Sequence, residues 1–352
     1  MIGLKRKGMM IAASMLLAVS TVGCSSTPDN DAVVAKVGED TISYGVANFY
    51  VRMQQAQYET YYAPMMGQDA ETMWSQKFEE GITFEEETKE SMLEALEDMY
   101  LIRQHAQAYE VSITEEEQEE IDKAADEFVE NNVLEDKEAV SGEKEYVQEL
   151  LELYTIQAKM DAPMKEGVDT EVSDEDAAQK KMEYVYFSYT KTDEEGNSSQ
   201  MSDEEKDALK EKANSFLDTV KADANKDMNA AASSSEVEVS TATFDSETTT
   251  VNSALVQAAD ALEQEGDVTD LVETDGGIYV AKLVSKLDRD ATDKEKEQIV
   301  EERRQEQYNT LLTQWREETD IQVEKSVWKK IDFKKQGVII KQDTEETTQE
   351  TE

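Results

Sequence analysis

Over residues 43–163 the apolar residues recur at intervals of three and four, the spacing that places them on one buried face of a helix. Two helix-capping pairs punctuate this stretch: Thr83 stands three residues before Glu86, and Thr114 three residues before Glu117. In such a pair each side chain accepts a hydrogen bond from the backbone N–H of the other residue, so the spacing marks a helix start. The sequence therefore predicts that this part of the chain is almost entirely helical.

A different pattern begins after Ser173-Asp174-Glu175, which itself predicts another helix start. The run 183–189 is rich in tyrosine and valine, as strands are. Further helix and strand patterns follow, and Gly276-Gly277 predicts a tight turn into a strand over 278–284. This mixture, about a hundred residues long, predicts one α+β domain. A long charged helix is expected over 292–318.

The N-terminus has the pattern of an export signal. Lys5, Arg6 and Lys7 precede an apolar stretch over 9–19, which is too short for a stable membrane span. Gly23-Cys24 follows, and Cys24 is the only cysteine in the 352 residues. A single cysteine gives an exported chain no disulfide framework.

This ending resembles the bacterial lipobox, in which the cysteine thiol receives a diacylglycerol before the signal is cleaved. The resemblance implies a signal peptide over 1–23, lipidation of Cys24 and a flexible tether over 24–30. The protein is then expected on the outer face of the cell membrane, lipid-anchored as in Gram-positive bacteria. Ordinary secretion with a free cysteine is the alternative.

The formal net charge of −46 excludes some classes of partner. Nucleic-acid binding requires a cationic surface, so no nucleic acid is expected. His105 is the only histidine, and neither a histidine cluster for a metal nor a glycine-rich phosphate loop is present in the sequence. We therefore expect no cofactor and no metal.

The order of these pieces resembles a known family. Residues 33–42 read VVAKVGEDTI, and with the stretch 101–117 they resemble the opening hairpin and helical linker of SurA- and PrsA-type extracytoplasmic foldases. The resemblance implies an α+β fold: a mostly helical chaperone domain, completed by a C-terminal helix, with an inserted parvulin-like (PpiC-type) peptidyl-prolyl isomerase domain. The implied boundaries are 31–175 for the chaperone domain, 176–290 for the insert, 291–342 for the returning segment and 343–352 for a disordered acidic tail.

The resemblance also identifies candidate catalytic positions. The two histidine positions of a parvulin align with Tyr184 and Tyr279 here. A tyrosine hydroxyl cannot reproduce the donor and acceptor nitrogens of an imidazole. Two roles are open for these tyrosines. They form a tyrosine-substituted isomerase site, or they are strand aromatics that only pack in a core.

Large flexible or aromatic side chains are candidates for contacting unfolded polypeptide, because they tolerate many apolar partners. We expect this role for Met65, Met66, Trp74 and Trp315, with core packing as the alternative for each. The leading hypothesis is a membrane-tethered foldase or chaperone whose partners are unfolded or newly exported polypeptides. An active isomerase, or a solute-binding or envelope-structural lipoprotein, are the alternatives. The sequence predicts no oligomeric state.

Overall fold

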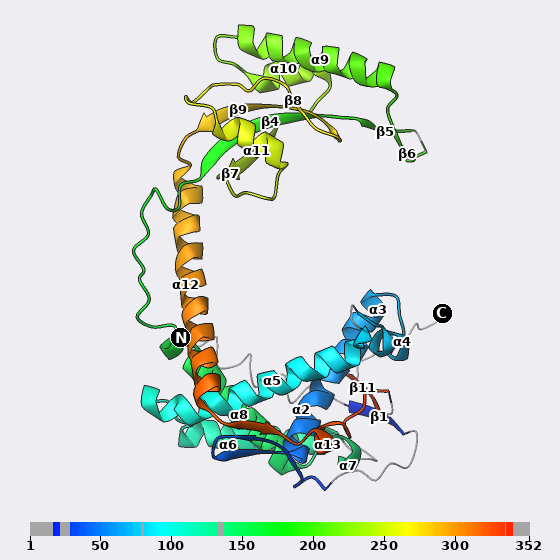
Figure 1. Ribbon diagram of the computed structural model, residues 1–352, viewed down its shortest axis with the longest axis vertical. Coiled ribbons are helices and arrows are strands. Elements are labelled where there is room, and N and C mark those ends of the chain that lie inside the picture. The colour runs from blue at the N-terminus through cyan, green and yellow to red at the C-terminus, as the bar shows by residue number, and fades with distance from the viewer. Residues whose placement is uncertain are drawn as a thin grey trace, which may run out of the picture. The chain divides into compact units, whose positions relative to one another are not determined.

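The computed structural model describes residues 17–21, 29–78, 81–132, 137–193, 195–334 and 336–340. It divides the chain into two compact units (Figure 1). Unit 1 comprises Met1–Gly167 and Gln305–Glu352, and unit 2 comprises Val168–Arg304. The fold is α+β, with one unit inserted into the sequence of the other, which confirms the expected fold class. The predicted lipidation site Cys24 and the predicted tail 343–352 lie outside the described residues.

Unit 1 is mostly helical. Its helices are α2 (Tyr44–Gln57), the π-helix η1 (Tyr58–Tyr62), α3 (Ala63–Met65), α4 (Ala70–Ser75), α5 (Phe84–His105), the 3-10 helix η3 (Ala106–Tyr109), α6 (Glu115–Asn131), α7 (Lys137–Val140), α8 (Lys144–Met164) and α13 (Lys325–Trp328). Its strands are β1 (Leu17–Thr21), β2 (Val33–Val37), β3 (Asp40–Ser43), β10 (Ile321–Val323) and β11 (Gln336–Ile340). The predicted caps are confirmed: Thr83 and Thr114 each form a complete capping box with the glutamate three residues on.

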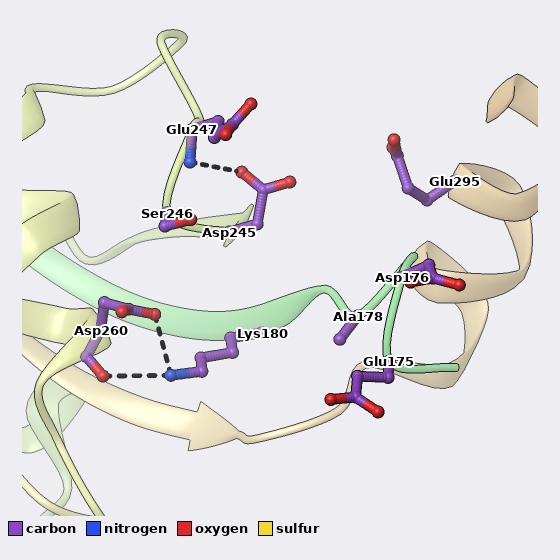
Figure 2. Close-up of a pocket in the computed structure, with 9 residues that line it drawn as sticks. All are labelled: Glu175, Asp176, Ala178, Lys180, Asp245, Ser246, Glu247, Asp260 and Glu295. Carbon is purple, nitrogen blue, oxygen red and sulfur yellow. Dashed lines mark hydrogen bonds and ion pairs between the residues drawn. The ribbon is translucent and has the colours of Figure 1, made fainter. Parts of the chain in front are cut away.

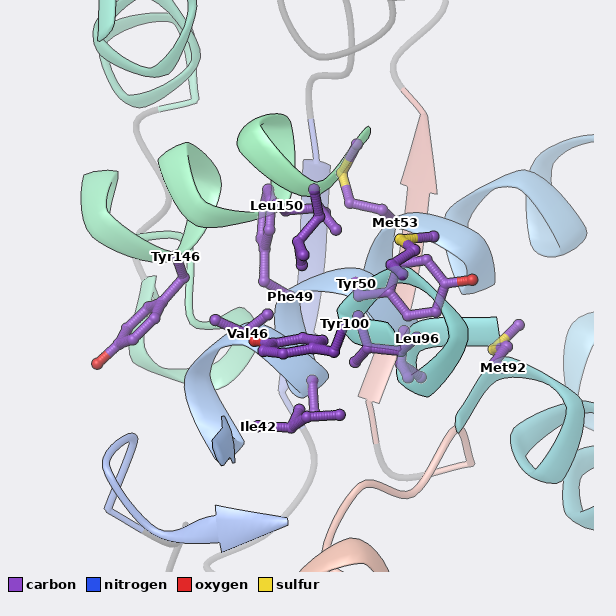
Figure 3. Close-up of a cluster of buried hydrophobic side chains, with 14 of the residues drawn as sticks. Ile42, Val46, Phe49, Tyr50, Met53, Met92, Leu96, Tyr100, Tyr146 and Leu150 are labelled. Atoms are coloured by element: carbon purple, nitrogen blue, oxygen red, sulfur yellow. The ribbon is translucent and has the colours of Figure 1, made fainter. Parts of the chain in front are cut away.

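The core of unit 1 lies among α2, α5 and α8 (Figure 3). Phe49 of α2 also meets Phe128 of α6 edge to face, with ring centroids 5.2 Å apart. At Gly45 of α2, a Cβ would lie 2.4 Å from the ring of Tyr146. Only glycine therefore allows α2 to pass this tyrosine of α8 without displacing it.

The C-terminal part of the chain returns to complete this core. Strand β10 pairs antiparallel with β2, giving the sheet order β10-β2-β3. The last turns of α12 (Arg289–Glu318) pack on α5, where Trp315 stacks on His105 at 4.1 Å and Arg316 bonds Glu97 at 2.7 Å. The expected return of the final helix to the N-terminal helices is confirmed.

Unit 2 holds a four-stranded antiparallel sheet in the order β7-β4-β9-β8. Its elements are β4 (Lys180–Ser188), β5 (Thr190–Thr192), β6 (Ser198–Gln200), α9 (Asp203–Ala222), α10 (Met228–Ser235), β7 (Ser240–Phe244), α11 (Ser253–Asp260), β8 (Val272–Glu273) and β9 (Gly277–Ser285). Two apolar clusters form, one between the sheet and α9 and α10, the other between the sheet and α11. Alternate residues of β4 therefore enter different clusters.

The predicted helix start at Ser173 is wrong. Ser173 does accept a hydrogen bond from the backbone N–H of Asp176, but the segment makes only a turn before β4. Asp174 is held instead by Arg289, whose guanidinium donates to both carboxylate oxygens at 2.7 and 2.9 Å. This contact is formed by residues far apart in the sequence, so the local capping pattern could not reveal it.

Among the described helices, none is both long enough and apolar enough to cross a membrane.

Candidate functional site: an exposed apolar patch

Exposed large apolar side chains are concentrated in one short segment. The structure describes seven of them, and six fall between residues 61 and 82. We call these six the apolar patch: Tyr61, Tyr62, Met65, Met66, Phe78 and Ile82. Large apolar patches on a soluble surface mark sites of interaction, whereas single exposed residues need no explanation.

The first half of the patch is presented by η1 and α3. Along these consecutive helical turns Tyr61 and Met65 stand four residues apart, as do Tyr62 and Met66. Met65 is 76% exposed, the highest value in the patch. Helical turns of the π type are rare and occur often at functional sites. Both predicted candidates, Met65 and Met66, are thus exposed at the surface.

The second half of the patch lies on a narrow hairpin between α4 and α5. An antiparallel bridge joins Lys77 to Thr83, and the backbone N–H of Phe78 donates to the carbonyl of Ile82 at 3.0 Å. Gly81 closes the turn with a φ of 80°, a left-handed conformation that other residues adopt only with strain. The hairpin thus holds Phe78 and Ile82 beside each other in solvent.

A groove connects this hairpin to the helices beneath it. It has a volume of about 770 Å³ and is lined by Tyr58, Phe78, Ile82, Phe84, Glu87, Thr88, Glu90 and Ser91. Tyr58 contacts both Tyr62 and Phe84, with ring centroids 5.0 and 5.8 Å apart, and Phe84 contacts Phe78 at 5.7 Å. Aromatic contacts therefore run without a break from one half of the patch to the other.

Trp74 and Trp315, by contrast, are core residues. Trp74 is 1% exposed, and its indole N–H donates to Glu59 at 2.9 Å. Trp315 is 5% exposed beneath the ring of His105. Neither can contact a partner at the surface, so the expectation that they bind unfolded polypeptide is corrected.

Tyr184 and Tyr279, the two residues expected at the parvulin histidine positions, lie close together on one face of the sheet of unit 2. Their ring centroids are 6.2 Å apart, with Tyr184 on β4 and Tyr279 on β9. A third tyrosine, Tyr186, lies directly opposite Tyr279 in the strand register and stacks on it at 4.4 Å. The alternation of residues along β4 could have identified it, since Tyr184 and Tyr186 share a face.

Among these tyrosines, the surroundings of Tyr279 disfavour loss of its hydroxyl proton. Burial raises the pKa of Tyr279, and the neighbouring Tyr186 and Tyr184 raise it further. Tyr186 donates its hydroxyl hydrogen to the carbonyl oxygen of Gly276 at 2.6 Å. The Tyr279 hydroxyl therefore keeps its proton and can donate a hydrogen bond.

Unit 2 also contains an acidic pocket of about 460 Å³ (Figure 2). Some of the carboxylates that line it have partners within unit 2. Lys180 bonds the carboxylate of Asp260 at 2.8 Å, and Gln179 donates to Asp245 at 2.8 Å. Within the described ranges, no group of three or more histidine, cysteine, aspartate or glutamate residues could hold a metal ion.

Together these features define an α+β chain with a helical unit that carries an exposed apolar patch and an inserted unit that carries a tyrosine cluster. No family model matches the sequence, and no curated protein matches it significantly. The chain is similar to solved structures of PrsA foldases, the family that the sequence resembles.

For the PrsA foldase of Lactococcus lactis the identity is 16% and the TM-score 0.34, over 85% of this chain and 97% of that one. PrsA of Streptococcus pneumoniae has an identity of 16% and a TM-score of 0.26, and the match covers 71% of this chain and 90% of that one. The peptidylprolyl isomerase PrsA of Bacillus anthracis has an identity of 18% and a TM-score of 0.23, and the match covers 64% of this chain and 96% of that one. Similarity at this level leaves activity to be argued from the chain's own residues.

Proposed function

We propose that this protein is a membrane-anchored extracytoplasmic chaperone that binds apolar segments of unfolded, exported polypeptides through the apolar patch. The observation that carries the proposal is the concentration of six exposed large apolar side chains on η1, α3 and the hairpin before α5. Covering apolar surface is favourable by roughly 25 cal/mol per Å², so a client with its own exposed apolar residues gains by lying there. Methionine and tyrosine adapt to many partners, which suits a binder of varied sequences.

Suppression of aggregation tests the proposal. The wild-type chain is expected to slow the aggregation of a chemically denatured test protein, measured by light scattering. The triple variant Tyr62→Ser/Met65→Ser/Phe78→Ser is expected to lose most of this effect. Met201→Ser, which removes a half-buried methionine from unit 2, is the matched control and should retain it. No suppression by the wild-type chain at any ratio would contradict the proposal and favour a solute-binding or structural lipoprotein.

The membrane anchor is part of the proposal and rests on the N-terminal sequence. We expect a lipid on Cys24 to hold the chain at the outer face of the membrane, where exported polypeptides emerge. Cys24→Ser should release the protein into the medium and abolish incorporation of labelled fatty acid. Strand β1 lies inside the expected signal peptide, so processing would also remove the strand that pairs with β11.

Peptidyl-prolyl isomerisation is the second candidate, favoured by the proximity of Tyr184, Tyr186 and Tyr279 on one sheet face. The reaction needs no nucleophile, only stabilisation of a twisted amide against a barrier of about 20 kcal/mol. Hydroxyl donors could contribute to this stabilisation. A protease-coupled peptide assay decides: activity that disappears in Tyr279→Phe supports catalysis by the cluster, and activity absent from the wild-type chain excludes it.

A further inference from the structure

The groove beside the apolar patch has two kinds of lining. Its walls are aromatic and aliphatic, formed by Tyr58, Phe78, Ile82 and Phe84. Its volume of about 770 Å³ is within the range of pockets that enclose a ligand, and it is large enough for more than one side chain. Apolar client residues would therefore enter the groove itself.

The rim of the groove is acidic. Glu87 and Glu90 line it from successive turns of α5, and both are exposed. Neither carboxylate forms an ion pair with any residue in the part of the chain that the structure describes. Among the described residues that line the groove, none is a lysine or an arginine. Two uncompensated negative charges therefore stand beside an apolar slot.

Such a rim discriminates between clients by their charge. A basic residue next to the buried apolar residue would lie within reach of Glu87 or Glu90, whereas an acidic residue there would be repelled. Exposed ion pairs are individually weak and are screened by salt, so the discrimination should be modest and dependent on ionic strength. Two such pairs correspond to about a fivefold change in affinity.

We infer that the groove selects extended client segments in which apolar residues are flanked by lysine or arginine. This inference rests on the proposed function and adds its substrate class. The net charge of the chain, −46, favours the same clients over longer distances. The groove adds a local contribution that depends on two named carboxylates.

Fluorescence anisotropy with three labelled peptides tests the inference on the full chain. Each peptide carries the same Leu-Phe-Leu centre, flanked on both sides by lysine, serine or glutamate. At ~20 mM salt the lysine-flanked peptide should bind about fivefold more tightly than the serine-flanked one, and the glutamate-flanked peptide more weakly than both. At ~300 mM salt the three affinities should converge.

Charge-matched variants separate the rim from the overall charge. Glu87→Gln/Glu90→Gln should remove most of the preference for the lysine-flanked peptide over the serine-flanked one. Glu204→Gln/Glu211→Gln removes the same charge from exposed positions of α9 and should keep the preference. Equal effects of the two double variants would overturn the inference, because selection would then come from the overall charge alone. If the wild-type chain binds none of the peptides, the proposed function fails together with the inference.

Discussion

Trp74 packs against Phe333 edge to face, with ring centroids 4.6 Å apart and planes inclined by 64°. The two residues come from the two separate stretches of sequence that form unit 1, and both are buried. The backbone N–H of Phe333 also donates to Glu85 at 2.9 Å, at the start of α5. The C-terminal segment is therefore part of the support beneath the apolar patch.

Phe333→Ala should destabilise unit 1 by about 3 kcal/mol, because it leaves a cavity against the indole of Trp74. Chemical denaturation followed by tryptophan fluorescence measures the loss. Lys330→Ala, at an exposed position three residues earlier, should change stability by less than about 0.5 kcal/mol. Equal stability of Phe333→Ala and wild type would show that the C-terminal segment does not complete this core.

Arg316 should give unit 1 a stability that depends on pH. Burial raises the pKa of Glu97 and of Asp98, and hydrogen bonds from Arg316 at 2.7 and 2.6 Å oppose that rise. When folding raises the pKa of a carboxyl, the free energy of unfolding falls as the pH rises toward the folded-state pKa. The reason is that the folded state must then carry the buried negative charge.

Arg316→Met removes the opposing hydrogen bonds and should raise both carboxyl pKa values further. Its deficit in stability should therefore grow from pH ~4, where most carboxyls in the unfolded chain are half protonated, to about 2 kcal/mol at pH ~7. Thermal unfolding across this range provides the measurement. A deficit of the same size at both pH values would contradict the proposed coupling.

Gly277 determines the position of the tyrosine cluster. A Cβ at this residue would lie 2.3 Å from the carbonyl oxygen of Phe187 and 2.6 Å from the ring of Tyr186. Gly277→Ala should therefore cost about 2 kcal/mol and separate Tyr186 from Tyr279, visible as a loss of ring-current shifts in NMR spectra. At Gly276 a Cβ would meet only the Tyr186 hydroxyl, at 2.9 Å, so Gly276→Ala should be milder. A larger loss of stability in Gly276→Ala than in Gly277→Ala would show that other contacts position the tyrosine rings.

Local signals in the sequence predict much of this fold. The hairpin of β2 and β3 is confirmed, and so are the two capping boxes. These features depend on residues within a few positions of one another, or on a long apolar periodicity. Met65 and Met66 are exposed, and their role in binding unfolded polypeptide stays a prediction.

Contacts between distant segments could not be predicted in the same way. The burial of Trp74 depends on Phe333, which is remote in sequence, and the burial of Trp315 depends in the same way on His105. The groove likewise needs Tyr58 of η1 and Phe84 of α5 to meet across the hairpin. Tyr186 could have been found from strand alternation alone.

Site-specific photo-crosslinking tests the central claim most directly. A benzophenone amino acid placed at position 65, in the apolar patch, should crosslink to an unfolded polypeptide that has just been diluted out of denaturant. The same group at position 201 of unit 2 is the matched control. Strong crosslinking at 65 and little at 201 is the predicted result. Equal yields at the two positions, or none at 65, would contradict binding of clients by the apolar patch.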